Sequence, residues 1–296
     1  MESLNRDERQ ALRSIQAHLG ASMLDAGAVL EQVGTLDVYI HPTNPDPYLN
    51  CASPHRGVAW VRRDDLNGAF AGLQHLGRIP RLVFQEALFP QALQQQLKGM
   101  GLTLEHERQV MAYRPVYGPN PPGEESLGRL PDTLPDDVTT QVATAEPDLA
   151  TWLRVFRSGY YNAETLTVDA ADVEPLIVAA NQGTSLFVTA SYRDTPLGAT
   201  RVGLRSSTAE LEAVVTAPLW HGMGLEAALV MTATREAMEG GCDVVFTVAQ
   251  SEDFIRLCRR LGFVEVTRVL TFWLIDQNDS TYRPGVPLFV PSQGEA

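Results

Sequence analysis

One stretch of the chain, residues 211–238 (LEAVVTAPLWHGMGLEAALVMTATREAM), constrains the fold more than any other. Its first six residues alternate between two faces with a period of two and are rich in β-branched side chains, which predicts a strand. Pro218 ends that strand, because proline brings no N–H group to a sheet. A turn containing two glycines follows, and apolar residues then recur at helical spacing until Gly240. The stretch therefore predicts a strand, a tight turn and a helix.

A strand that delivers a glycine turn onto the start of a helix predicts an anion site. The first N–H groups of a helix have no partner inside the helix, and the helix dipole adds about half a positive charge at that end. Glycines let a phosphate approach the backbone closely. A pyrophosphate is the expected ligand. Neither the G-x-x-x-x-G-K-[ST] loop nor the G-x-G-x-x-G loop of the common nucleotide sites occurs here.

The turn resembles the acetyl-coenzyme A loop of the GNAT superfamily of N-acetyltransferases, [Q/R]-x-x-G-x-[G/A] after a strand that ends in V-x-P. The six positions of that loop are filled here by His221, Gly222, Met223, Gly224, Leu225 and Glu226. The central glycine matches at Gly224. His221 replaces Gln or Arg, and Glu226 replaces Gly or Ala. A carboxylate in the first turn repels a pyrophosphate if it points inward.

A second motif of the same family follows at the expected distance. The family pattern is N-x-x-A-x-x-L-Y-x-x-L-G-F, and the corresponding residues here are Ser251, Phe254, Leu257, Cys258, Leu261, Gly262 and Phe263. The Leu-Gly-Phe ending agrees. Ser251 takes the place of the family's Asn, and Cys258 takes the place of the Tyr that usually serves as general acid. The two motifs together cover residues 209–263.

The resemblance implies direct attack of an amine on acetyl-coenzyme A, without an acyl-enzyme. It implies that backbone groups around Val214, Val215 and Thr216 hold the pantetheine arm like an added strand. The diphosphate is then bound by N–H groups of the loop from His221 to Glu226, with Ser251 close by. Acetyl-coenzyme A is the expected co-substrate, and no metal is expected.

Acetyl transfer needs a group that accepts the proton of the amine and a proton for the leaving thiolate. Glu210 and Glu212 are the candidate bases, since they are two residues apart on one strand and are expected to share a face. The alternative is that one or both simply face solvent. Cys258 is the candidate acid or nucleophile, and the alternative is a small buried apolar group.

Tyr160 and Tyr161 fall in a predicted loop, residues 158–165, which borders the acceptor pocket in this family. They suggest an aromatic or amphipathic wall for the acceptor, and packing in the core is the alternative. The acceptor is expected to be an amine of a small molecule or a peptide.

The N-terminal half repeats the order of elements seen in the C-terminal half. The strand at residues 82–84 corresponds to that at 244–246, and Gly101 corresponds to Gly262. The predicted fold class is α/β (α+β), with two GNAT-like units that are each a mixed, mostly antiparallel sheet flanked by helices. The expected ranges are a degenerate unit at 1–117, a proline-rich linker at 118–136, an acetyltransferase domain at 137–276 and a tail at 277–296.

The first unit lacks the glycine turn. Arg62, Arg63, Asp64 and Asp65 stand where its helix begins, and the carboxylates are expected to fill the N-terminal donor site in place of a phosphate. We therefore expect only the second unit to bind the cofactor.

Composition excludes several classes of partner. The net charge of −13 argues against nucleic acid and anionic membranes, which select a basic face. Three scattered cysteines are too few for a disulfide framework or a zinc site. Without a signal-peptide core or an apolar run of about 18 residues, a cytoplasmic monomer or homodimer is expected. The predicted function is acetyl-coenzyme A dependent N-acetyl transfer. The alternatives are a degenerate scaffold that binds coenzyme A or a protein partner, and transfer of a longer acyl group.

Overall fold

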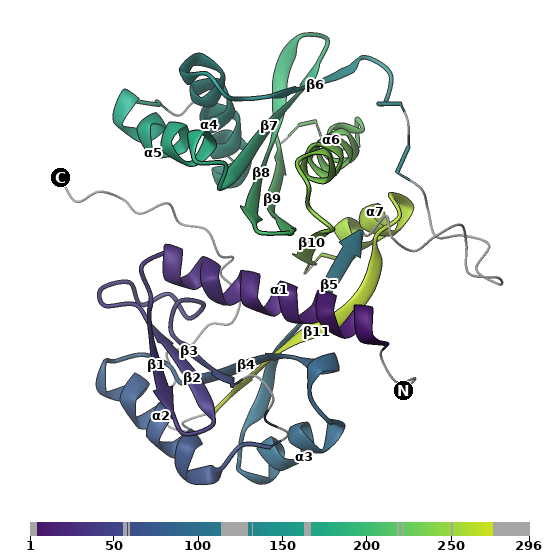
Figure 1. Cartoon of the computed structure of the whole chain (residues 1–296). Coiled ribbons are helices and arrows are strands. Elements are labelled where there is room, and N and C mark those ends of the chain that lie inside the picture. The colour runs from purple at the N-terminus through teal and green to yellow at the C-terminus, as the bar shows by residue number, and fades with distance from the viewer. Residues whose placement is uncertain are drawn as a thin grey trace. The chain divides into compact units, whose positions relative to one another are not determined.

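The structure is a computed structural model that describes residues 5–55, 58, 60–113, 130–131, 133–162, 167–217, 219–220, 222–249 and 251–274 (Figure 1). The chain divides into two compact units. Of the described residues, those within Met1–Arg108 and Thr267–Ala296 form unit 1, and those within Gln109–Val266 form unit 2.

Unit 1 is a mixed sheet with helices, and its strand order is β1-β2-β3-β4-β11. Only β3 and β4 run parallel, and they pair at a single position, Ala52 with Leu82. The elements in chain order are α1 (Arg6–Asp25), β1 (Val29–Val33), β2 (Leu36–Ile40), β3 (Cys51–Pro54), α2 (Arg63–His75), β4 (Arg81–Gln85), the 3₁₀ turn η1 (Glu86–Leu88), α3 (Gln91–Gly99) and the first half of β5 (Thr103–Tyr113).

Unit 2 has the strand order β5-β10-β9-β8-β7-β6, and only β9 and β10 run parallel. Its elements are β6 (Val138–Val142), α4 (Glu146–Tyr161), α5 (Ala170–Asn181), β7 (Ser185–Tyr192), β8 (Thr195–Arg205), β9 (Thr208–Thr216), α6 (Leu225–Glu239), β10 (Val244–Ala249), α7 (Glu252–Arg260) and the start of β11 (Val264–Trp273). The predicted fold class is confirmed: each unit is a mixed, mostly antiparallel sheet flanked by helices.

The last strand of each sequence repeat pairs with a strand of the other repeat. The end of β5 pairs with β10, with Ala112 opposite Phe246, and the end of β11 pairs with β4, with Leu270 opposite Phe84. The hydrophobic cores follow the same exchange, because Met111 belongs to the core of unit 2 and Leu270 to that of unit 1. Each compact unit therefore includes the end of the last strand of the other repeat. The ranges predicted from the sequence give the boundaries of the two repeats instead.

Three local predictions differ from the structure. Strand β1 was not predicted, because most of its side chains are exposed and show no alternation of apolar residues. The apolar residues at 58–61 (VAWV) suggest another short strand, which is absent among the described residues of that stretch. Helix α4 continues to Tyr161, so Tyr160 and Tyr161 lie on a helix and not on a loop. Stacking of Phe156 on Tyr160, one helical turn apart, favours the longer helix.

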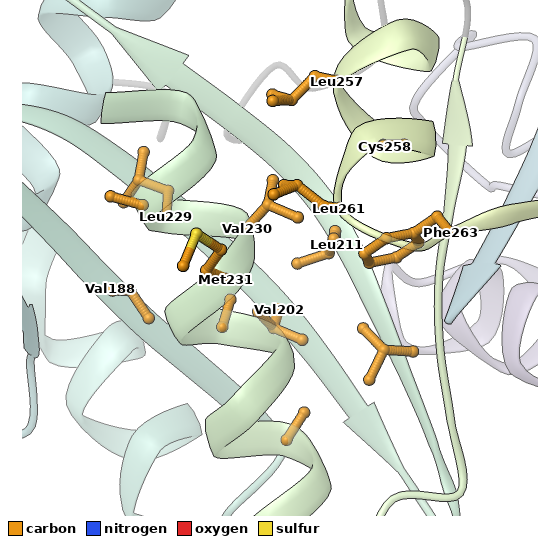
Figure 2. Packing of buried hydrophobic residues seen from close by; sticks show 14 of the residues in the cluster. Val188, Val202, Leu211, Leu229, Val230, Met231, Leu257, Cys258, Leu261 and Phe263 are labelled. Carbon is orange, nitrogen blue, oxygen red and sulfur yellow. The ribbon is translucent and has the colours of Figure 1, made fainter. Parts of the chain in front are cut away.

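Helix α6 fixes the turn that precedes it, because its residues 228–234 are all buried in unit 2. Figure 1 shows α4 and α5 on one side of strands β7, β8 and β9, and α6 on the other. Small residues let the helix approach, since Ala228 and Ala233 are fully buried. Figure 2 shows the hydrophobic core of unit 2, where side chains from β7, β8 and β9 meet those of α6, of α7 and of the connection after α7. The residues are Val188, Val202, Leu211, Leu229, Val230, Met231, Leu257, Leu261 and Phe263. Each large side chain buried there stabilises the fold by roughly 1.5–3 kcal/mol.

Candidate functional site

Strands β9 and β10 separate halfway along their length. They pair in parallel only at Thr208, Ala209 and Glu210. Beyond that point β9 stays paired with β8 as far as Thr216, and β10 stays paired with β5. Thr247 donates a hydrogen bond from Oγ1 to the carbonyl of Leu211 at 3.0 Å, where the strands part. The far end of β9 is thus not covered by β10 in the described pairing, and an extended ligand can add to such an edge.

The turn that follows β9 needs glycine at two positions for different reasons. Gly224 is the N-cap of α6 with φ 81° and ψ −1°, and Gly222 has φ 82°. Both are left-handed conformations that favour glycine. A Cβ atom on Gly224 would meet Pro135 Cγ at 2.7 Å, whereas a Cβ on Gly222 would meet nothing within 4 Å. Met223 between them is 40% exposed. His221 lies outside the described residues.

Leu225 and Glu226 begin α6 and point in different directions. Leu225 is 1% exposed and belongs to the core, so its backbone is the part that can serve a ligand. Glu226 turns back toward the end of β9, where Thr216 donates from Oγ1 to Glu226 Oε1 at 3.4 Å. A negative charge is favourable in the first turn of a helix. The chain therefore brings its own carboxylate to the corner where the sequence predicts a diphosphate.

Glu212 sits at a β-bulge and forms an ion pair. Leu211 is opposite Val202 and Ala213 is opposite Arg201, so Glu212 is the extra residue between them. Its Oε2 lies 3.0 Å from Arg201 Nε, and the two side chains are only 19% and 27% exposed, respectively. Burial raises the pKa of Glu212, and the positive charges of Arg201 and Arg205 act in the opposite direction.

Glu210 lies on the same side of the sheet as this ion pair. It is opposite Gly203 on β8, and Gly203 is opposite Ser185 on β7. Arg201 donates from Nη2 to Ser185 Oγ at 3.3 Å, which places the guanidinium on the face that Ser185 occupies. Directly opposed residues of adjacent strands share a face. The structure thus brings the two predicted bases together, with Arg201 beside Glu212.

Cys258 lies in the core and not on an accessible surface. Its relative exposure is 0%, and burial raises the pKa of its thiol to about 12. Figure 2 shows Cys258 on α7, in the cluster that also contains Leu257 and Leu261. The thiol keeps its proton at neutral pH and is shielded from solvent, which favours the packing alternative. Ser251 is the exposed N-cap residue of α7 and makes no capping hydrogen bond with its side chain.

Helix α4 brings Tyr160 to the end of β9. A Cβ atom on Gly159 would stand 2.9 Å from the carbonyl oxygen of Thr216 and 3.1 Å from Val215 Cβ, so the last turn of α4 packs on the strand. The ring of Tyr160 continues a stack along α4, with Tyr161 edge-on to it at 5.2 Å. Tyr160 is half-buried and Tyr161 is 46% exposed. One edge of the site is therefore aromatic.

Four residues of this corner were not singled out from the sequence: Pro135, Gly159, Ser185 and Arg201. Gly159 carried a usable signal, because a glycine inside a helical pattern often marks a close packing contact. The other three carried none, since their contacts join segments far apart in the chain.

The corresponding turn of unit 1 is occupied by side chains of unit 1 itself. Gln96 donates from Nε2 to the carbonyl of Val61 at 2.6 Å and accepts from the Val61 N–H at 3.3 Å. Asp65 does not fill the helix start as expected; it accepts hydrogen bonds from Thr35 N and Oγ1, which lower its pKa. Arg62, the N-cap residue of α2, makes no capping bond with its side chain.

Among the residues that the structure describes, no three His, Cys, Asp or Glu side chains are grouped so as to hold a metal ion. None of the helices in the described ranges combines the length and the hydropathy needed to cross a membrane.

Comparison with known proteins gives a family for part of unit 2 and a fold for both units. Residues 147–263 match the model of the acetyltransferase (GNAT) family. A solved GCN5-related N-acetyltransferase from Kribbella flavida is similar in fold, with a TM-score of 0.63 and 18% identity over 87% of this chain and 93% of that chain. One from Sphaerobacter thermophilus has a TM-score of 0.57 and 14% identity over 90% and 91% of the two chains.

A tandem GNAT protein from the clavulanic acid biosynthesis pathway has a TM-score of 0.51 and 16% identity, over 83% of this chain and 82% of that chain. A search of curated proteins found no match. At these identities the structural likeness shows the fold alone, and it extends over both units. The chain therefore carries a domain of the acetyltransferase (GNAT) family at residues 147–263, preceded by a unit that fits a second GNAT-like fold.

Proposed function

We propose that unit 2 is an acetyl-coenzyme A dependent N-acetyltransferase that acts on an amine of a small molecule or a peptide. The observation that carries this proposal is the separation of β9 from β10 after Glu210, directly before the glycine turn at the start of α6. An uncovered strand edge that leads to a helix N-terminus suits a ligand with an amide-bearing arm and a diphosphate.

The residues of this corner fit acetyl-coenzyme A in two respects and oppose it in one. The backbone of Val214, Val215 and Thr216 is placed to hold the pantetheine arm. The N–H groups of the turn from His221 to Glu226 would bind the diphosphate in this proposal, and a Cβ on Gly222 would meet nothing within 4 Å. The Glu226 carboxylate adds a repulsive charge. When bound, the thioester supplies an activated acetyl group.

In the proposed reaction, the amine nitrogen forms a bond to the acetyl carbon as the carbon–sulfur bond breaks. Glu212, or Glu210 through a water molecule, accepts the proton that the amine loses. The leaving thiolate takes a proton from solvent, since Cys258 is buried in the core. Tyr160 and Tyr161 form the aromatic wall of the acceptor site.

A coupled assay of free thiol release, run over a panel of amines, tests this function. We expect acetyl-coenzyme A consumption that depends on the amine, with the acetylated amine identified by mass spectrometry. Replacement of the true base by glutamine should lower kcat by roughly 10²–10⁴-fold. Glu212→Gln and Glu210→Gln are therefore measured side by side. Equal activity of both variants and the wild type would remove the carboxylates from the mechanism.

A second function is favoured by one observation, the contact between Glu226 and Thr216. A carboxylate at the start of α6 repels a diphosphate, and a scaffold that no longer binds the cofactor would tolerate it. The proposed enzyme predicts that Glu226→Gln strengthens acetyl-coenzyme A binding by roughly two- to fivefold at low salt, because one negative charge near the diphosphate is removed. Isothermal titration that detects no binding to either protein would leave the scaffold as the better account.

Location and assembly stay predictions. The cysteines at positions 51, 242 and 258 are buried and unpaired, which is typical of a reducing compartment such as the cytoplasm. A monomer or a homodimer is expected, and sedimentation of the full chain distinguishes them.

A further inference from the structure

Arg201, on β8, contacts Glu212 on β9 and Ser185 on β7. Its Nε lies 3.0 Å from Glu212 Oε2, and its Nη2 donates to Ser185 Oγ at 3.3 Å. Ser185, the first residue of β7, is 5% exposed. The guanidinium of Arg201, on β8, therefore contacts β9 through an ion pair with Glu212 and β7 through a hydrogen bond to Ser185.

The bulge places Glu212 between two register positions of β8. Leu211 is opposite Val202 and Ala213 is opposite Arg201, so Glu212 lies next to the strand position of Arg201. As the extra residue, Glu212 has no opposing partner on β8, and a bulge changes the direction of its side chain. A bulge at this position is thus a feature that directs one carboxylate.

The other charged groups around Glu212 come from few elements. Arg205 on β8 adds a second positive charge, and Glu210 on β9 adds a negative one. Opposite Glu210, β10 presents Phe246. Helix α4, which packs on β8 and β9, buries only apolar residues there: Leu149, Trp152, Leu153, Val155 and Phe156.

The remaining titratable groups of α4 lie apart from this set or at the far end of β9. Arg157 is paired with Asp172 of α5 at 2.9 Å. Tyr160 directly follows Gly159, which packs on the backbone of Thr216 at the far end of β9. Arg201 is thus a cation in direct contact with Glu212, at 3.0 Å.

We propose that Arg201, anchored by Ser185, is a positioning residue that aims the Glu212 carboxylate and keeps it in its ionised, proton-accepting form. This inference rests on the proposed acetyl transfer. A buried carboxylate without a nearby cation holds its proton to a higher pH and cannot accept one from the amine. With Arg201 in place, Glu212 takes the proton of the amine, and the proton then leaves to solvent through water.

The test compares Arg201→Met with Ser185→Ala, Arg201→Lys and the wild type. Two quantities are measured in each: the pKa of Glu212, by NMR titration of ¹³C-labelled glutamate assigned with Glu212→Gln, and the acidic limb of the kcat profile against pH. Arg201→Met is expected to raise the pKa of Glu212 and the pH of the acidic limb by about one unit each. A neighbouring opposite charge shifts the pKa of a carboxylate by about one to three units, and we expect the lower end of that range. At a pH below the limb, kcat then falls by about tenfold, while the plateau at high pH is retained.

The other variants separate positioning from simple structural support. Ser185→Ala should shift both quantities in the same direction by less, and Arg201→Lys should restore most of the wild-type profile. Arg193→Met is the matched control, since Arg193 forms an exposed ion pair with Asp137 at the other end of the β7–β8 hairpin. It should shift neither quantity.

An unchanged pKa of Glu212 in Arg201→Met would overturn the inference. If that variant does not fold, an unchanged pKa of Glu212 in Ser185→Ala has the same meaning. The NMR titration does not depend on turnover. A shifted pKa in a protein that acetylates no amine would therefore refute the proposed function and leave the electrostatic role of Arg201 intact.

Discussion

Pro135 lies directly against Gly224: a Cβ atom on Gly224 would stand 2.7 Å from Pro135 Cγ and 2.8 Å from its Cβ. The contact ties the segment before β6 to the turn before α6. Gly224 is thus required by its left-handed φ of 81° and by packing, in addition to any ligand. A substitution at Gly224 disturbs fold and binding together, so it cannot test the ligand site alone. Gly222, with open space around it, separates the two effects.

Gly222→Asp should weaken acetyl-coenzyme A binding by at least tenfold relative to Gly222→Asn. Both residues strain the same left-handed position, and both tolerate it better than most side chains do. They differ in charge, and only aspartate repels a diphosphate held by the turn. Isothermal titration gives the two dissociation constants, and thermal melting confirms equal stability. Equal affinities in the two variants would place the diphosphate elsewhere.

Gly159→Ala should damage the site by moving α4 away from β9. The added methyl group would meet the Thr216 carbonyl at 2.9 Å, which requires the backbone to shift. We expect a loss of roughly 1–3 kcal/mol of unfolding free energy, typical of overpacking, together with a raised KM for the acceptor. Gly72→Ala on α2 is the control, since nothing lies within 4 Å of its new methyl group. It should be neutral or stabilising by about 0.4–1 kcal/mol. Equal effects of the two changes would argue against the α4–β9 contact.

Most elements of both units could be predicted from local patterns. The strand, turn and helix around Gly224 follow from the alternation before Pro218, the glycines and the helical spacing after them. The Leu-Gly-Phe ending of the second motif forms the connection between α7 and β11. Strand β1 was missed because an exposed edge strand has no apolar face, and the end of α4 was misplaced because stacking of Phe156 on Tyr160 extends the helix.

The contacts that shape the site depend on tertiary structure and have no local signature. Arg201 and Glu212 form their ion pair across two strands, beside a bulge in the pairing of β8 with β9. The approach of Pro135 to Gly224 joins residues 89 positions apart in the chain. The sequence placed Cys258 at a catalytic motif position, yet only packing decides that this position is buried.

Cys258→Ala should retain kcat within about threefold and lose roughly 1–2 kcal/mol of stability, as deletion of a buried apolar group does. The pH dependence follows from the thiol pKa of about 12 in the folded chain, which is raised from 9.0. The folded form binds the proton more tightly, so the stabilisation is complete below pH 9 and is lost as the pH rises toward 12. The variant should lack this loss in chemical denaturation followed from pH 8 to pH 11. A hundredfold fall in kcat with unchanged stability would restore a catalytic role for the thiol.

The exchanged strands predict that the acetyltransferase domain does not fold when it is cut at the sequence repeat. A fragment of residues 130–274 lacks β5, whose residues Gln109–Tyr113 pair with β10 and whose Met111 is fully buried in the core. We expect an aggregated or molten fragment by size-exclusion chromatography and near-UV circular dichroism. Co-expression with residues 1–113 should rescue it. A monomeric fragment with a melting temperature close to that of the full chain would show that the exchange is dispensable.

The most direct test of the central claim is hydrogen–deuterium exchange of the full-length wild type, with and without saturating acetyl-coenzyme A. The account predicts slower exchange at the amides of residues 213–216 on β9 and 222–226 at the start of α6, and no change at residues 60–66 of unit 1. Protection of the unit 1 segment, or unchanged exchange at the start of α6 when binding is saturated, would contradict it.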